Sequence, residues 1–136
     1  MGRILAIDYG RKRCGLAVTD PEQIIGNPLT TVSTHELIPF LKKYIVEENV
    51  ECIVVGEPRQ MDNTASETEQ FIRPFVKQIR KLFPDMKIER IDERFTSLMA
   101  SQSILKSGAK KKDRQDKGLV DKVSAAIILQ TYLDMR

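Results

Sequence analysis

The chain has 136 residues, of which 41% are hydrophobic and 30% are charged, and its formal net charge is +3 at pH 7. This length suits a single domain, expected to span residues 1–136, that buries a core without disulfides or structural zinc. No apolar run approaches the roughly 20 residues of a membrane span, so we expect a cytoplasmic protein that does not bind membranes. The two cysteines stand singly in predicted strands, and the only histidine, His35, lies in a capping-box pattern. Both observations argue against a His- or Cys-rich zinc site.

The order of the predicted strands and helices defines the expected sheet. Strands are expected at residues 2–8, 14–19, 24–32, 52–55 and 87–93. Helices are expected at 33–48, 96–107 and 117–133, and a further one starts at either of two capping boxes, Thr64-x-x-Glu67 or Ser66-x-x-Glu69, and ends at residue 83. The segment YGRKR joins the first two strands as a hairpin, so these two strands are antiparallel. Helical crossovers make the first, fourth and fifth strands parallel to one another. The pattern predicts an α/β fold with a five-stranded mixed sheet, in which the first three strands form an antiparallel meander.

Acidic residues follow the three strands that are expected to be parallel. Asp8 ends the first strand, Glu57 follows the fourth, and Asp92 and Glu93 end the fifth. Because parallel strands bring their carboxyl ends to one edge of a sheet, these acids should converge there. Carboxylates without His or Cys favour the hard cations Mg²⁺ and Mn²⁺. Such ions can activate a water molecule and stabilise the leaving oxygen of a phosphodiester, so the acids predict metal-dependent phosphodiester hydrolysis.

A further acid, Asp121, interrupts the apolar pattern of the last helix. It shares one stripe of that helix with Ala125, Ile128 and Tyr132. An aspartate facing inward there carries a large desolvation penalty unless it is paired or binds a metal. A salt bridge to Lys or Arg would explain Asp121 without any function, but the acids at the strand ends favour a metal ligand.

The excess positive charge lies in one polar segment, residues 106–118, which contains six Lys or Arg and two Asp. A solvated connection commonly has this composition. In a protein with an acidic metal site, however, a mobile basic loop that contacts phosphates is the better interpretation. The side chains expected to position a nucleic-acid backbone are Arg11, Lys12, Arg13, Arg94, Lys110, Lys111, Lys112 and Arg114.

Four segments together resemble the YqgF/RuvX family, relatives of the RuvC Holliday junction resolvases. They are IDYGRKRCGLAVTD (7–20), VVGEPRQMDNTAS (54–66), IDERFTS (91–97) and DKVSAAIIL (121–129). The resemblance implies an RNase H-like (RuvC-like) fold with helices on both faces of the sheet. It also implies a nuclease that matures the 5′ end of pre-16S rRNA, or that resolves branched DNA in some members.

The resemblance assigns roles to individual acids. Asp8 falls on the metal ligand of the first strand and Asp121 on that of the last helix. Glu93 is the preferred acid between them, with Glu57 and Asp92 as further candidate ligands, so the expected catalytic set is Asp8, Glu93 and Asp121. RuvC-type enzymes carry a second acid three residues later in the last helix, where this chain has Ser124. This departure weakens the expectation of tight two-metal binding and of junction resolution in particular.

Two other interpretations compete with the nuclease. A non-catalytic protein that binds rRNA or the ribosome could use the same basic loop, with the acids serving only in salt bridges. The Asp8-x-Gly10 hairpin also resembles the first phosphate loop of actin and the sugar kinases, but a single copy in 136 residues cannot build their two-lobed cleft. A monomer suffices for single-site RNA processing, whereas symmetric cutting of a junction needs a dimer. We therefore expect a monomer or a weak homodimer.

Overall fold

A computed structural model describes residues 2–58, 67–93 and 117–135 of the chain, and for 117–121 it describes the backbone alone. The strands are β1 (Arg3–Asp8), β2 (Arg13–Thr19), β3 (Gly26–Ser33), β4 (Val50–Glu57) and β5 (Lys87–Asp92). The helical elements are a 3-10 turn η1 (Thr34–Glu36), α1 (Leu37–Glu47), α2 (Glu69–Leu82) and α5 (Lys117–Met135). The helix expected at 96–107 lies outside the described residues.

The five strands form one mixed sheet in the order β3-β2-β1-β4-β5. β1 pairs antiparallel with β2, and β2 pairs antiparallel with β3. β4 pairs in parallel with both β1 and β5. This arrangement confirms the predicted mixed sheet and its antiparallel meander. It also brings the carboxyl ends of β1, β4 and β5 to the same edge.

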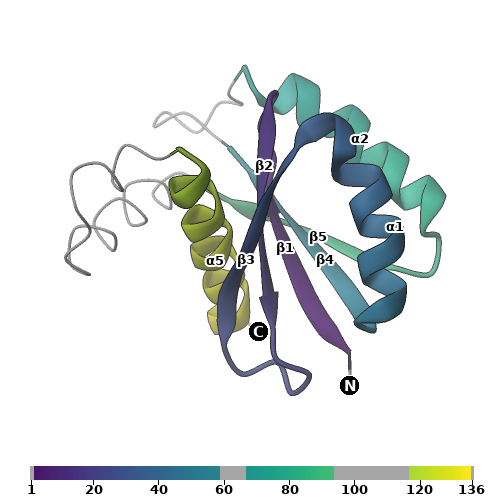
Figure 1. Ribbon diagram of the computed structural model, residues 1–136, viewed down its shortest axis with the longest axis vertical. Helices are drawn as coiled ribbons and strands as arrows, with labels where there is room; N and C mark the ends of the chain where they lie inside the picture. The colour runs from purple at the N-terminus through teal and green to yellow at the C-terminus, as the bar shows by residue number, and fades with distance from the viewer. Residues whose placement is uncertain (1, 59–66, 94–116, 136) are drawn as a thin grey trace.

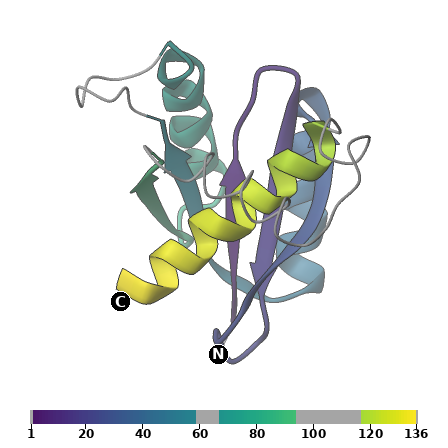
Figure 2. The same ribbon diagram turned by 90° about the vertical axis from the view of Figure 1, so that its left-hand side faces the viewer.

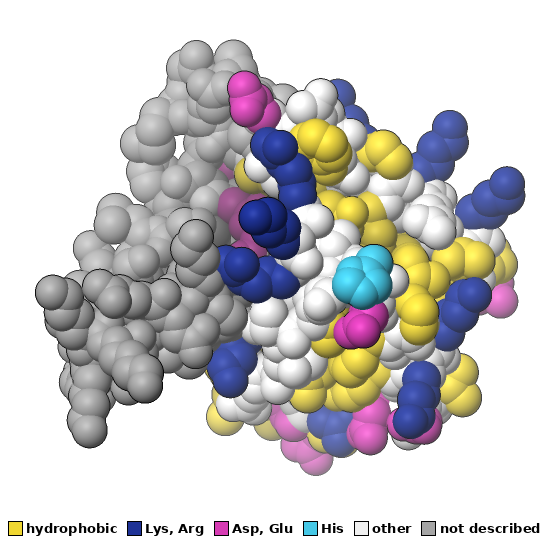
Figure 3. Space-filling model, turned by 45° about the horizontal axis from the view of Figure 1, so that its top comes forward, with side chains coloured by type: hydrophobic (Ala, Val, Ile, Leu, Met, Phe, Trp, Pro, Cys, Tyr) yellow, Lys and Arg dark blue, Asp and Glu magenta, His cyan; other side chains and the backbone are white. Residues whose placement is uncertain are grey.

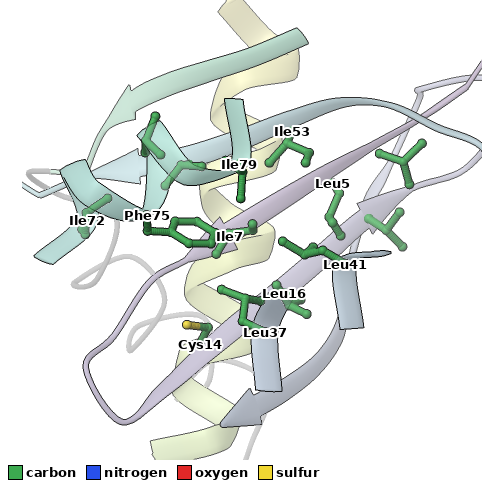
Figure 4. Packing of buried hydrophobic residues seen from close by; sticks show 14 residues of the cluster. Leu5, Ile7, Cys14, Leu16, Leu37, Leu41, Ile53, Ile72, Phe75 and Ile79 are labelled. Atoms are coloured by element: carbon green, nitrogen blue, oxygen red, sulfur yellow. The ribbon is translucent and has the colours of Figure 1, made fainter. Parts of the chain in front are cut away.

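Helices cover both faces of the sheet, as expected (Figures 1 and 2). Of the described helices, α1 and α2 pack on one face, and α5 lies across the other. Side chains alternate between two cores because successive residues of a strand point to opposite faces. In β1, Leu5 and Ile7 belong to the core beneath α1 and α2 (Figure 4), whereas Ile4 and Ala6 belong to the core beneath α5. This alternation assigns a face to each residue at the strand ends.

The start of the first helix differs from the sequence expectation. Ser33 makes no side-chain capping hydrogen bond, and a 3-10 turn precedes α1. The chain is anchored instead at Thr34, whose backbone N–H donates to the Lys12 carbonyl at 3.0 Å and whose hydroxyl donates to the Gly10 carbonyl at 2.7 Å. The β1–β2 turn therefore fixes this end of the helix. His35 is exposed, in agreement with its interpretation as a surface residue.

The fourth strand is longer than predicted, and the third is irregular. β4 begins and ends two residues beyond the predicted 52–55, because it pairs in parallel with β1 from Val50 and with β5 as far as Glu57. β3 is irregular, as expected, with a register shift opposite Leu16 and Ala17 of β2.

Candidate active site

Asp8 and Glu93 meet at the carboxyl edge of the sheet, on the face that α5 covers. Asp8 ends β1 and lies an even number of residues from Ile4 and Ala6, which pack against α5, so it belongs to the same face of the strand. Glu93 follows β5 and has the same alternation as Ile91, which belongs to that core too. A hydrogen bond joins the two carboxyl groups. Two of the three acids expected to be catalytic are thus in contact.

Glu93 is held in an environment that disfavours its charge. The residue is 9% exposed. Burial is the largest cause that raises the pKa of Glu93 to about 9, followed by the charge of Asp8 and the hydrogen bond to it, while Arg90 opposes the shift. In the absence of a cation, Glu93 therefore keeps its proton at neutral pH and shares it with Asp8.

The backbone of β4 makes room for Glu93. A Cβ atom added to Gly56 would lie 2.5 Å from Cδ and 2.6 Å from Oε2 of Glu93. The Glu93 backbone N–H donates to the Glu57 carbonyl at 3.0 Å, which extends the β4–β5 pairing by one step. The absence of a side chain at Gly56 thus lets the Glu93 carboxyl group lie over the end of β4, beside Asp8.

Glu57 and Asp92 reach the same edge but belong to the other face. They are paired across the β4–β5 ladder. Glu57 belongs to the same face of β4 as Ile53 and Val55, which pack beneath α1 and α2. Asp92 belongs to the same face of β5 as Ile88, which packs against that core too. Convergence of the strand ends is therefore confirmed, but the pleat of the sheet separates these two acids from Asp8 and Glu93.

Asp121 lies in the second turn of α5. Ser124, Ala125, Ile128 and Leu129 are buried and lie three, four, seven and eight residues further along the helix. Helical periodicity thus places position 121 on the stripe of α5 that packs on the sheet. The position of its side chain lies outside the description.

The donor set fits a hard divalent cation. Asp8 and Glu93 offer carboxylate oxygens only, the ligand type that Mg²⁺ and Mn²⁺ prefer over softer metals. A cation between the two groups would take the place of the shared proton and remove the repulsion that otherwise keeps Glu93 neutral. Among the side chains that the structure describes, no group of three or more potential ligands comes together. A third ligand would have to come from elsewhere, and Asp121 is the candidate.

A buried ion pair beneath this edge was missed by the sequence reasoning. Arg90 of β5 donates through Nη2 to Oε1 of Glu69 at 2.7 Å, and the Glu69 side chain is only 4% exposed. The same guanidinium donates to the carbonyls of Val55 at 3.2 Å and Gly56 at 2.9 Å. Arg90 therefore ties α2 to the end of β4, next to the residue over which Glu93 lies.

Several of the expected nucleic-acid contacts lie at the same end of the molecule. Arg11 and Lys12 are exposed in the β1–β2 turn, and Arg13 begins β2. The Arg11 guanidinium lies 4.5 Å from the ring centroid of Phe71 in α2, a cation–π contact. Figure 3 views this end and shows Lys and Arg side chains beside acidic ones. Arg94, Lys110, Lys111, Lys112 and Arg114 lie outside the described residues.

Asp20 stays apart from the other acids, at the opposite edge of the sheet. Its carboxylate accepts hydrogen bonds from the backbone N–H groups of Ile24 and Ile25, each at 2.9 Å. These bonds, the one to Ile25 foremost, hold the pKa of Asp20 below its usual value. This agrees with its interpretation as a turn residue.

In the part of the chain that is described, none of the helices has the length and apolar character needed to cross a membrane.

Sequence comparison places the whole chain within one family. Residues 2–135 match the family model described as "RuvX: Holliday junction resolvase". A protein of Phocaeicola vulgatus is 59% identical over 136 residues, covering all of this chain and 98% of the relative. A protein of Bacteroides fragilis is 56% identical, covering all of this chain and 99% of the relative. Both relatives carry the name "Putative pre-16S rRNA nuclease".

Two solved structures of Holliday junction resolvases resemble this chain in fold. RuvC of T. thermophilus in complex with a Holliday junction substrate has a TM-score of 0.57 at 16% identity, covering 99% of this chain and 96% of that one. The yeast mitochondrial Holliday junction resolvase has a TM-score of 0.54 at 13% identity, covering 97% and 78%. At these identities the likeness shows the RuvC-like, RNase H-like fold alone. The fold expectation is confirmed, and the full-length match shows that this chain belongs to the RuvX family.

Proposed function

We propose that the chain is a cytoplasmic, divalent-metal-dependent endonuclease that hydrolyses phosphodiester bonds during 5′-end maturation of pre-16S rRNA. The observation that carries this proposal is the hydrogen-bonded pair of Asp8 and Glu93 on the face that α5 covers. An acid pair with one member buried is costly for folding unless a ligand uses it, because each carboxylate disfavours the charge of the other. The names of the close relatives support the choice of RNA substrate.

In this proposal Asp8, Glu93 and Asp121 hold Mg²⁺ or Mn²⁺. When bound, the metal would supply a nucleophilic hydroxide and stabilise the charge that develops on the phosphate and the leaving oxygen. Glu93 must give up its proton before it can act as a ligand, so metal binding releases a proton and strengthens as pH rises. Asp8 and Gly56 fix the position of the Glu93 carboxyl group, and burial of that group limits access of bulk water.

The exposed cations of the β1–β2 turn would position the substrate. Arg11 and Lys12 lie in the turn that directly follows Asp8 at the end of β1, and their charges can contact phosphates on either side of the cut. The contact between Arg11 and Phe71 holds the guanidinium over α2. These contacts to the backbone do not distinguish RNA from branched DNA, which is why the experiment includes both.

The test is cleavage of labelled pre-16S rRNA and of a four-way DNA junction, each with Mn²⁺ or with chelator. Wild type is compared with Asp8→Asn and with the control Asp85→Asn, which makes the same chemical change in the exposed turn between α2 and β5. The proposal expects metal-dependent cutting of the RNA that is lost in Asp8→Asn and kept in Asp85→Asn. Cutting of the junction alone would assign a resolvase. RNA binding without cutting, unaffected by chelator, would assign a non-catalytic binding protein.

A further inference from the structure

A groove of about 280 Å³ runs between α2 and the edge strand β5. Its lining consists of Arg73, Val76, Lys77 and Arg80 from α2 and Arg90 from β5. The three cations of α2 are spaced at positions i, i+4 and i+7, so they form one stripe along the flank of the helix next to β5. Four of the five lining side chains are therefore cationic.

Nearby acids neutralise only part of this charge. Glu69 forms salt bridges with Arg73 at 3.3 Å and with Arg90 at 2.7 Å. Within the described ranges, no carboxylate forms a salt bridge with Lys77 or Arg80, and both side chains are exposed. Like charges three or four residues apart destabilise a helix by about a few tenths of a kcal/mol, part of which the helix dipole offsets because Arg80 lies in the last turn of α2. A bound polyanion would remove the remaining repulsion.

The groove lies on the α2 face of the sheet and is linked through Arg90 to the end of β4, over which Glu93 lies on the other face. Arg90 lines the groove and also donates to the Gly56 carbonyl at 2.9 Å. Gly56 is the residue over which the Glu93 carboxyl group lies. From Arg73 to Arg80 the stripe extends about 10 Å along α2, at a rise of about 1.5 Å per residue. A stripe of that length can contact about two successive phosphates of one strand.

We propose that this groove binds the phosphodiester backbone of the nucleic-acid substrate beside the point of cleavage. Arginine presents a planar fork that matches phosphate, and lysine adds a compact charge, so the lining suits repeated phosphates. The proposal concerns the same site as the proposed nuclease and depends on it for the identity of the ligand. Binding can nevertheless be measured without cleavage, so the two proposals can fail separately.

The experiment measures binding of labelled pre-16S rRNA in chelator, as a function of salt, for wild type and two double variants. In K77E/R80E the charge of the groove is reversed. The control K42E/K43E makes the same change in net charge on the exposed surface of α1. Loss of two phosphate contacts should weaken binding by about tenfold or more and reduce the slope of log Kd against log salt by about 1.4 for single-stranded RNA. The control should change Kd by less than about threefold.

Equal effects of the two variants would mean that net charge alone matters and would overturn the proposal. Wild-type affinity and salt slope in K77E/R80E would also overturn it. A poly-glutamate peptide is tested beside the RNA as a model of an acidic protein partner. If K77E/R80E loses peptide binding but keeps RNA binding, the groove binds an acidic protein instead of RNA, and the proposal is overturned. Because binding is measured in chelator, the result does not depend on cleavage. RNA binding in the groove can be confirmed even if the protein never cleaves RNA, and it can be refuted even if the protein is an active nuclease.

Discussion

Replacement of Gly56 by alanine tests whether the position of Glu93 matters for chemistry. The new Cβ would lie 2.5 Å from Cδ of Glu93, whereas ordinary contacts begin at 3.4 Å, so the carboxyl group must move by about 1 Å. A misplacement of that size at a reacting centre costs about 10²-fold in rate. Overpacking costs about 1–3 kcal/mol, and loss of glycine's freedom in the unfolded chain offsets about 0.4–1 kcal/mol. We therefore expect a net loss of about 1 kcal/mol in the free energy of unfolding.

The assay combines single-turnover cleavage of pre-16S rRNA with urea unfolding. Gly26→Ala is the matched control, because its Cβ would meet Cγ of Leu129 at 2.9 Å, at the other edge of the sheet. Gly26→Ala should lose a similar amount of stability and keep its activity, which separates loss of position from loss of fold. If Gly56→Ala cleaves within about twofold of wild type, the observed position of Glu93 is not needed for the reaction, against the expected cost of about 10²-fold.

Three further predictions concern the acids and their partners. Glu93→Gln should abolish cleavage, whereas Glu57→Gln and Asp92→Asn should keep most of it, because these two acids belong to the other face of the sheet; equal losses in all three variants would refute that assignment. In chelator, the free energy of unfolding should fall as pH rises from about 4.5 to 9, because folding raises the pKa of Glu93, so the unfolded chain releases this proton first. Urea titrations should give a slope of at most about 1.4 kcal/mol per pH unit, absent in Glu93→Gln. Arg90→Ala should destabilise the protein by at most about 3–5 kcal/mol, because buried Glu69 keeps only the exposed Arg73 as an ion-pair partner, and thermal unfolding should show partial recovery in Arg90→Ala/Glu69→Ala.

The sequence pattern predicted the sheet and the edge at which the acids lie, but not the face of the sheet to which each acid belongs. Strand order follows from the hairpin and the helical crossovers, and parallel strands bring Asp8, Glu57, Asp92 and Glu93 to one edge. The choice among these acids depends on which residues of each strand face α5. In a strand that is buried on both faces, the side chains that point to either face are apolar. The sequence pattern therefore does not indicate which side chains face which helix. Packing of α5 against the core that contains Ile91 places Glu93, and not Asp92, on the same face as Asp8.

The ion pair between Glu69 and Arg90 could not be read from the sequence for a related reason. Ser66-x-x-Glu69 is a capping-box pattern, so the local interpretation of Glu69 is complete without a distant partner. Its pairing with Arg90 depends on how α2 lies against β5, 21 residues away along the chain. Long-range pairs between charged residues leave no periodic signal. The same limit applies to the groove, whose cations are divided between a helix and an edge strand.

Arg90 belongs to both the groove and the support of the acid pair, so its substitution cannot separate their roles. Its guanidinium holds Glu69 at 2.7 Å and the Gly56 carbonyl at 2.9 Å, and loss of either contact would disturb the end of β4 where Glu93 lies. Lys77 and Arg80 line the groove without such contacts among the described residues. An effect of K77E/R80E on RNA affinity, with cleavage of the bound RNA unchanged at saturation, would therefore assign phosphate binding to the groove alone. A loss of the chemical step as well would mean that phosphates held in the groove align the scissile bond with Asp8 and Glu93.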